Sequence, residues 1–243
     1  MCIRDSNYSR STTYDVSSVE IEMNLSIKNL NLKIDSVQIL KNLSADIPSE
    51  KLTCLIGPNG SGKSSILRVI SKEISTFSGN ITEIDWKDMT YLPQDPISPP
   101  FLNVSEIKNL GFYGKNLNKP ERHEKLLRLL DTCGISSISG QPFLEISSGE
   151  RQRTWLAFAL AQDKKVILMD EPLSAVDIYG QKDFFQLLKE ITNIGKTILM
   201  VTHDVAMAVE YADNIISLVD GTIAYEGHSK DFKNSSDPYG LQN

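Results

Sequence analysis

The chain has 243 residues, of which 40% are hydrophobic and 23% are charged, a balance typical of folded globular proteins and unlike that of disordered or disulfide-rich chains. Its 25 basic and 31 acidic residues give a net charge of −6, so the composition does not favour extended binding to nucleic acid. The longest apolar runs fall far short of the roughly 20 residues that a membrane-spanning helix requires. Any role at a membrane therefore depends on a partner.

Residues 1–20 are rich in serine and threonine and show no hydrophobic periodicity. We expect this segment to be disordered or of artificial origin, because its opening residues resemble translated adapter sequence and it lacks the apolar core of a secretion signal. Residues 21–235 are predicted to form one domain, and residues 236–243 a tail. Within the domain, apolar and polar residues alternate from residue 25 to Pro48, which predicts antiparallel strands.

Apolar spacing predicts short strands and helices up to the middle of the chain. The expected elements are a strand at 51–56, a helix at 63–74, and strands at 81–84 and 89–92. Four prolines between residues 93 and 100 then interrupt regular structure. The leucine spacing that follows, notably at 121–133, is typical of helices and predicts an inserted helical subdomain at about 97–147.

Beyond residue 147, predicted helices alternate with predicted strands. The helices are expected at 150–161, 178–192 and 205–211, and the strands at 165–169, 197–201 and 214–218. Such alternation favours a mainly parallel sheet with helices on both faces. The predicted fold is therefore α/β, with an antiparallel β subdomain at its start and an α-helical subdomain inserted between strands.

Residues 57–64 match the pattern G-x-x-x-x-G-K-[ST] of a phosphate-binding loop (P-loop), between a predicted strand and a predicted helix. The glycines allow successive backbone N–H groups to converge on an anion, and the helix adds the positive end of its dipole. Lys63 is expected to reach the β- and γ-phosphates of ATP, and the Ser64 hydroxyl to bind Mg²⁺. The alternative is an ordinary glycine turn. The predicted nucleotide-binding residues are Gly57, Pro58, Asn59, Gly60, Ser61, Gly62, Lys63, Ser64 and Ser65.

A second motif places Asp170 and Glu171 at the end of the predicted strand 165–169, directly before Pro172. In a P-loop protein the aspartate at such a strand end is the second metal anchor. We therefore predict that Asp170 holds Mg²⁺ and that Glu171 polarises the attacking water. Alone, the two acids could be a solvated strand end, but together with the P-loop they predict a P-loop NTPase core.

Residues 146–153 read Ile-Ser-Ser-Gly-Glu-Arg-Gln-Arg and closely resemble the signature segment, Leu-Ser-Gly-Gly-Gln/Glu, of ABC-type ATPases. Residues 174–177 resemble the D-loop of that family, Gln94 its Q-loop and His203 its switch histidine, and all motifs stand in the family's order over roughly residues 25–232. Taken singly, Gln94 and His203 would be an ordinary loop residue and a strand-end residue. The resemblance implies catalytic roles for Gln94, Glu171 and His203, a Mg²⁺ contact by Gln94, and nucleotide contacts by Ser147, Ser148, Gly149, Glu150 and Asp177.

The resemblance also implies a dimer, expected to be a homodimer, because the family holds each ATP between the P-loop of one subunit and the signature of the other. Two residues depart from the family pattern. Ser148 replaces the first glycine of the signature, which favours glycine for its backbone shape or close approach, so we expect Ser148→Gly to hydrolyse ATP equally fast or faster. Ile34 stands where the family has an aromatic residue that stacks on adenine, which predicts looser base recognition.

Residues 150–157 and 177–181 resemble the ATPase subunits of bacterial importers for ferric siderophores, haem and cobalamin. This implies polytopic permease subunits as partners, an indirect link to a periplasmic or extracellular binding protein, no nucleic acid, and a peripheral location at the cytoplasmic face of the inner membrane. Phe101, Leu102 and Val104 are candidates for a groove that docks the permease, with core packing as the alternative.

Two other functions are compatible with the same motifs. One is a soluble ABC ATPase of translation or DNA repair, although such relatives usually carry tandem cassettes or long coiled-coil insertions. The other is a weakly hydrolytic nucleotide switch, suggested by Ser148 and Ile34 and disfavoured by the complete set of Lys63, Glu171 and His203. A permease gene beside this one would select the importer.

Overall fold

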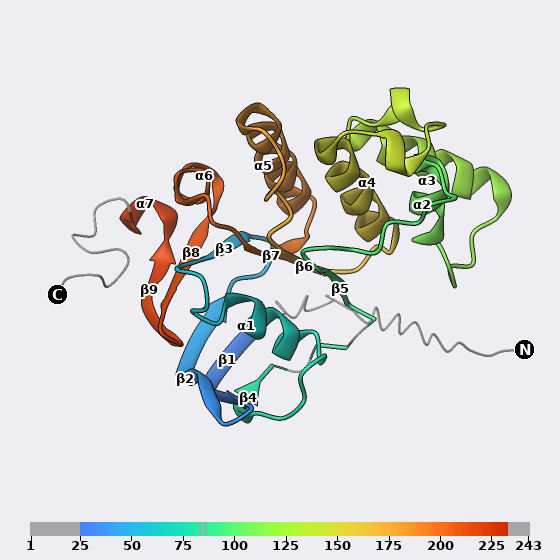
Figure 1. Cartoon of the computed structure of the whole chain (residues 1–243). Coiled ribbons are helices and arrows are strands. Elements are labelled where there is room, and N and C mark those ends of the chain that lie inside the picture. The colour runs from blue at the N-terminus through green and yellow to red at the C-terminus, as the bar shows by residue number, and fades with distance from the viewer. Residues whose placement is uncertain (1–24, 83, 86, 233–243) are drawn as a thin grey trace, which may run out of the picture.

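The computed structural model describes residues 25–82, 84–85 and 87–232. The expectations for residues 1–20 and for the tail at 236–243 lie outside these ranges. Figure 1 shows a larger sheet across the middle of the molecule, with α4, α5 and α6 on one side of it and α1 with a smaller sheet on the other. The predicted α/β class, with an antiparallel sheet and a mainly parallel one, is confirmed.

The smaller sheet is antiparallel and has the strand order β2-β1-β4. Its strands are β1 (Leu25–Ile34), β2 (Val37–Ile47) and β4 (Ser78–Ile81). The strand predicted at 81–84 is therefore displaced toward the N-terminus. The reason is that β4 is an edge strand whose Ser78 and Asn80 pair with β1 through their backbones while remaining exposed, so the strand lacks the apolar alternation used to predict it.

The larger sheet has the strand order β5-β6-β7-β3-β8-β9 and is parallel except for β9. Its strands are β3 (Leu52–Ile56), β5 (Met89–Leu92), β6 (Val166–Asp170), β7 (Thr197–Val201), β8 (Asn214–Val219) and β9 (Thr222–His228). The central strands β3, β6 and β7 are buried along their whole length, which explains their continuous apolar sequences. Within β3, Cys54 packs toward the helical face and Leu55 toward the smaller sheet.

Helices cover both faces of the larger sheet. They are α1 (Lys63–Ile70), α4 (Ser148–Ala161), α5 (Ile178–Asn193), α6 (Val205–Tyr211) and α7 (Ser229–Phe232). Helix α1 ends at Ile70 rather than at residue 74 as predicted, because Lys72 has a φ of 66°, which an α-helix cannot accommodate.

The helices between β5 and β6 form a separate group with α4 at its inner edge (Figure 1). They are α2 (Val104–Leu110) and α3 (Lys119–Thr132), followed by short 3₁₀ turns at Ser136–Ile138 and Phe143–Glu145. Helices α2, α3 and α4 each begin with a capping box, in which the N-cap side chain and a glutamate three residues later bond each other's backbone. Among the described residues, no helix is both long enough and apolar enough to cross a membrane.

Candidate nucleotide-binding site

The P-loop connects β3 to α1 at the carboxyl end of the larger sheet, and two of its glycines, Gly57 and Gly62, lie close to neighbouring strands as well as having positive φ. Gly57 has a φ of 139°, and a Cβ there would lie 2.1 Å from the carbonyl oxygen of Leu218. Gly62 has a φ of 104°, and a Cβ there would lie 2.5 Å from Leu40 Cδ2. Both φ values belong to the left-handed region that glycine adopts readily. Neighbouring β2 and β8 therefore fix the shape of the loop.

Lys63 is buried at the start of α1, and its ammonium group points into the loop. The Nζ atom donates to the carbonyl oxygens of Gly57 and Pro58, each at 2.9 Å. Burial lowers the pKa of Lys63, and the nearby carboxylates of Glu171 and Asp170 oppose that shift. The Ser61 hydroxyl is buried in the same loop without a hydrogen-bond partner. The loop thus offers a positive charge and an unused hydroxyl, which suits a phosphate ligand.

Ser64 and Asp170 meet behind the P-loop as the motifs predict. Ser64 Oγ donates to Asp170 Oδ1 at 2.9 Å, and the Tyr91 hydroxyl approaches Asp170 Oδ2 at 3.4 Å. Asp170 is buried at the end of β6, and burial raises the pKa of its carboxyl group. The described residues contain no group of three or more acidic, histidine or cysteine side chains able to hold a metal. Mg²⁺ bound mainly by water and phosphates needs no such group, so the paired hydroxyl and carboxylate fit it.

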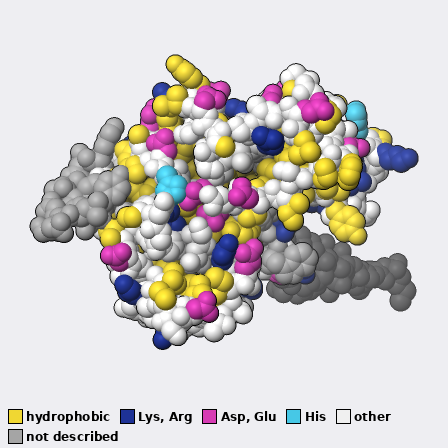
Figure 2. All heavy atoms as spheres, viewed as in Figure 1, with side chains coloured by type: hydrophobic (Ala, Val, Ile, Leu, Met, Phe, Trp, Pro, Cys, Tyr) yellow, Lys and Arg dark blue, Asp and Glu magenta, His cyan; other side chains and the backbone are white. Residues whose placement is uncertain are grey.

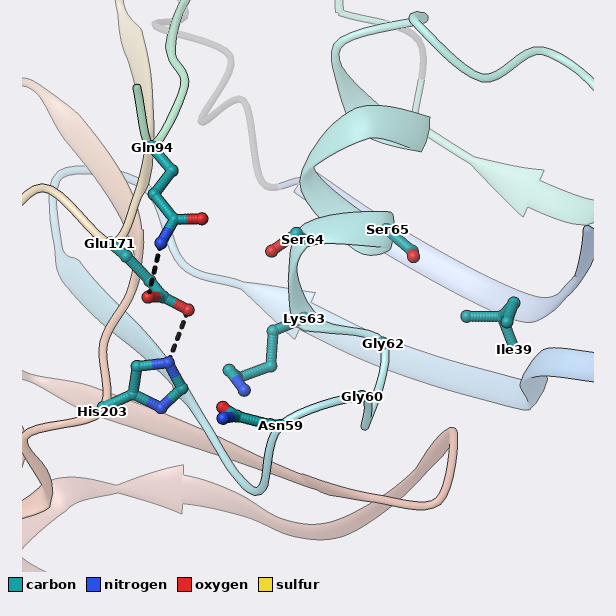
Figure 3. A pocket seen from close by; sticks show the side chains of 10 residues that line it. All are labelled: Ile39, Asn59, Gly60, Gly62, Lys63, Ser64, Ser65, Gln94, Glu171 and His203. Atoms are coloured by element: carbon teal, nitrogen blue, oxygen red, sulfur yellow. Dashed lines mark hydrogen bonds and ion pairs between the residues drawn. The ribbon is translucent and has the colours of Figure 1, made fainter. Parts of the chain in front are cut away.

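Gln94, Glu171 and His203 converge opposite the P-loop (Figure 3). Gln94 Nε2 donates to Glu171 Oε2 at 3.1 Å, and His203 Nε2 lies 2.6 Å from Glu171 Oε1. Gln94 follows β5, Glu171 follows β6 and His203 follows β7, so three neighbouring parallel strands deliver the group to one edge of the sheet. Glu171 also has a φ of 47°, a costly conformation for a residue with a Cβ.

A cavity of about 460 Å³ joins these groups (Figure 3). Nine of the predicted site residues line it together with Ile39 of β2: Asn59, Gly60, Gly62, Lys63, Ser64, Ser65, Gln94, Glu171 and His203. The residues predicted to bind phosphate, to bind metal and to accept a proton therefore line the same cavity. This arrangement can bind a nucleoside triphosphate and activate water beside its terminal phosphate.

Sequence comparison agrees with this geometry. The ABC transporter family matches residues 40–174, which is more than half of the chain. The chain belongs to the ABC transporter family. It is an ABC-type ATPase, and the family and α/β fold expected from the sequence are confirmed.

Several ABC transporter proteins of known role are similar to it over most of their length. The chain is 34% identical over 219 residues to the iron(3+)-hydroxamate import ATP-binding protein FhuC of Bacillus subtilis (strain 168), covering 84% of this chain and 81% of that protein. It is 31% identical over 220 residues to the hemin import ATP-binding protein HmuV of Shewanella denitrificans, covering 84% and 87%. The solved structure of cbiO1 from Clostridium perfringens, part of the ABC transporter complex cbiONQ, has a TM-score of 0.81 at 24% identity, covering 89% of this chain and 92% of that one.

The signature segment of this ABC ATPase lies apart from the cavity within one chain. Ser147, Ser148, Gly149, Glu150 and Asp177 are absent from its lining. Ser147 caps α4, with its backbone N–H and hydroxyl both donating to Glu150 Oε2 at 2.8 and 2.7 Å. These hydrogen bonds lower the pKa of Glu150. Asp177 caps α5 by accepting from the backbone N–H groups of Tyr179 and Gly180. The signature and D-loop residues therefore also define the starts of two helices.

The structure bears on three expectations about individual residues. Ser148 begins α4 without a positive φ, so the backbone there does not require glycine. Ile34 is 39% exposed at the end of β1 and does not line the cavity, whereas Ile39 does. Of the three groove candidates, Val104 is fully buried in the core and Leu102 packs against that core, as the core-packing alternative predicts, while Phe101 is 93% exposed.

Proposed function

We propose that this chain is the ATP-hydrolysing subunit of a membrane importer for a ferric siderophore, haem or cobalamin, bound at the cytoplasmic face of the membrane. The catalytic part of this proposal rests on the placement of Glu171, whose carboxylate is held between Gln94 and His203 and faces the P-loop lysine. The import part is supported by the names of the relatives, which include hydroxamate, hemin and enterobactin import or transport proteins. Those relatives also favour an importer over a translation or repair factor.

Each side chain has a defined task in the proposed hydrolysis of ATP to ADP and phosphate. Glu171 accepts a proton from the attacking water, and its two carboxylate oxygens are oriented by Gln94 and His203. Lys63 balances charge on the phosphate chain, with its position set by the loop carbonyls. Ser64 and Asp170 would hold Mg²⁺, which when bound neutralises charge on the β- and γ-phosphates.

The proposed active form is a dimer with two nucleotides between its subunits. Ser147 and Gly149 lie outside their own chain's cavity, so a role in nucleotide binding requires that they contact the nucleotide of a second subunit. The resemblance of the signature segment to that of ABC ATPases supports this geometry. Loss of the γ-phosphate would remove the contacts that bridge the subunits and let them separate.

The Glu171→Gln variant tests the catalytic assignment. We expect it to lose at least about 100-fold in kcat, the typical worth of a general base, while it still binds ATP. The variant should therefore accumulate as an ATP-bound dimer, which size-exclusion chromatography with Mg²⁺ and ATP detects. Glu124→Gln, on the exposed face of α3, is the matched control and should behave as the wild type. A Glu171→Gln protein that remains monomeric and hydrolyses ATP normally would contradict the proposal.

The proposed permease-docking surface lies between the Q-loop and the end of α2. Ile97, Phe101 and Tyr113 are each at least 90% exposed, although their side chains are large and apolar. Figure 2 shows hydrophobic side chains gathered on this side of the molecule, over the helical group. We expect Phe101→Ser to keep the basal ATPase rate but to lose co-purification with a co-expressed permease subunit. Full retention of the permease by this variant would exclude Phe101 from the interface.

A further inference from the structure

A side-chain hydrogen bond joins the start of the signature helix to the D-loop within one subunit. Ser148 is the first residue of α4, and its Oγ donates to the carbonyl oxygen of Ala175 at 2.6 Å. Ala175 belongs to the turn between β6 and α5, so the bond connects two elements that lie 27 residues apart in the sequence. A glycine, which the usual signature carries at this position, could not make it.

The D-loop turn is held from two sides, of which Ser148 provides one. On the α5 side, Gln181 Nε2 donates to the carbonyl oxygen of Val176 at 2.8 Å. The Val176 side chain is buried, and a Cβ built on Gly149 would lie 3.7 Å from its Cγ1 atom. Removal of the Ser148 hydroxyl would therefore leave the turn anchored to α5 and only packed against α4.

The same turn begins at the catalytic carboxylate. The backbone N–H of Ser174 donates to the carbonyl oxygen of Glu171 at 3.4 Å, and Glu171 itself is held at a φ of 47°. Ala175 lies only four residues after Glu171 in this folded turn. A displacement of Ala175 can therefore reach Glu171 through the turn. Strained backbone of this kind keeps its conformation only where the surrounding contacts fix it.

We propose that Ser148 is a positioning residue that ties the signature helix to the turn carrying Glu171. In the proposed dimer, the signature contacts the nucleotide of the second subunit, whereas Glu171 serves the nucleotide of its own subunit. The hydroxyl would therefore transmit occupancy of one nucleotide site to the carboxylate of the other. This coupling between the two nucleotide sites rests on the proposed dimeric ATPase. The hydrogen bond from Ser148 to Ala175 exists within a single chain.

Hydrogen exchange of the nucleotide-free chain tests the link without any activity. In Ser148→Ala, we expect amides at 171–177 to exchange about fivefold faster, the factor that corresponds to one ordinary hydrogen bond. Ser148→Thr keeps the hydroxyl and should restore protection. The matched control is Ser229→Ala, because Ser229 Oγ also donates to an alanine carbonyl, that of Ala212, at 2.6 Å, but far from the site. That control should leave exchange at 171–177 unchanged.

The kinetic consequence separates the positioning role from a merely structural one. We expect Ser148→Ala and Ser148→Gly to lower kcat about fivefold and to reduce the Hill coefficient for ATP toward one, with the affinity for Mg·ADP unchanged. This is the opposite of what the sequence alone predicts for Ser148→Gly. Wild-type exchange rates at 171–177 in Ser148→Ala would show that the Ser148 hydroxyl does not hold the turn. A wild-type Hill coefficient would show that it does not couple the two nucleotide sites. If the Glu171→Gln variant shows that the catalytic proposal fails, hydrogen exchange still tests whether Ser148 holds the turn.

Discussion

Gly57 illustrates at the scale of one residue how the P-loop depends on structure outside its own motif. Its Cα faces the backbone of β8, so an added methyl group meets a carbonyl oxygen that cannot move away without distorting the sheet. The residue also needs a left-handed φ, which costs a non-glycine residue about 1–2 kcal/mol. Gly114 also has a positive φ, of 77°, but no atom lies within 4 Å of an added Cβ, so Gly114→Ala carries a conformational cost without overpacking.

We therefore expect Gly57→Ala to destabilise the protein by about 1–3 kcal/mol more than Gly114→Ala, because overpacking adds about that amount to the conformational cost. Urea unfolding followed by circular dichroism gives both free energies of unfolding. Equal losses in the two variants would show that Leu218 yields to the methyl group and that conformation alone selects glycine.

The sequence predicts the reactive residues of the site better than their surroundings. Lys63, Asp170 and Glu171 follow from short motifs, because the chemistry of phosphate and metal binding restricts both residue type and spacing. Ile39 and Tyr91 do not follow from any motif. Which residue of the β1–β2 hairpin faces the cavity depends on strand register and on its bulges, which a family pattern aligned on Ile34 does not contain.

At the scale of elements, the buried parallel strands were predictable from their apolar runs, and the edge strands were less so. Strand β9 was missed because its residues are largely exposed, but Asp220 and Gly221 carry a usable signal. Both have positive φ, 48° and 80°, as in the Asp-Gly turns that join antiparallel strands. Similarly, the Asn-x-x-Glu spacing at Asn103 and Asn118 marks the starts of α2 and α3.

A buried lysine makes the stability of the helical group depend on pH. Lys108 of α2 is fully buried, and its ammonium group donates to the carbonyl oxygen of Leu126 in α3. Burial lowers the pKa of Lys108 to about 8. Between that value and about 10.4, its pKa in an unfolded chain, the unfolded protein holds a proton that the native protein has lost. Over this window Lys108 makes the free energy of unfolding rise with pH.

The variant Lys108→Met removes that contribution. We expect it to be about 1–2 kcal/mol more stable than the wild type at pH 7, since replacing a buried charge by an apolar group is often stabilising. The difference should shrink between pH 8 and 10. Burial raises the pKa of Cys133 to about 12, which destabilises both proteins at high pH. Because the Lys108 charge opposes that shift, the destabilisation is larger in Lys108→Met and adds to the shrinking of the difference. A difference that stays constant from pH 7 to 10 would mean that Lys108 does not titrate in this window.

At the scale of the whole molecule, the nucleotide site lies where the two hydrophobic cores meet. One core packs the helices against the larger sheet, and the other packs α1 and the smaller sheet against its opposite face. The P-loop continues from β3, whose side chains alternate between both cores. A ligand held by Lys63, Ser64 and Asp170 therefore bridges α1 and β6, and its binding energy should add to the stability of the entire domain.

Thermal unfolding with nucleotide tests this linkage and the role of Mg²⁺ together. At a concentration 100 times its dissociation constant, Mg·ATP should add about 2.7 kcal/mol and raise the melting temperature by about 5–10 °C. Lys63→Met should abolish the increase, because the anion then meets no cation in the loop. Ser64→Ala should keep the stabilisation given by ATP with EDTA but lose the further gain from Mg²⁺, since its hydroxyl is the proposed metal ligand. An undiminished magnesium gain in Ser64→Ala would place the ion away from Ser64 and would leave Asp170 as its remaining anchor.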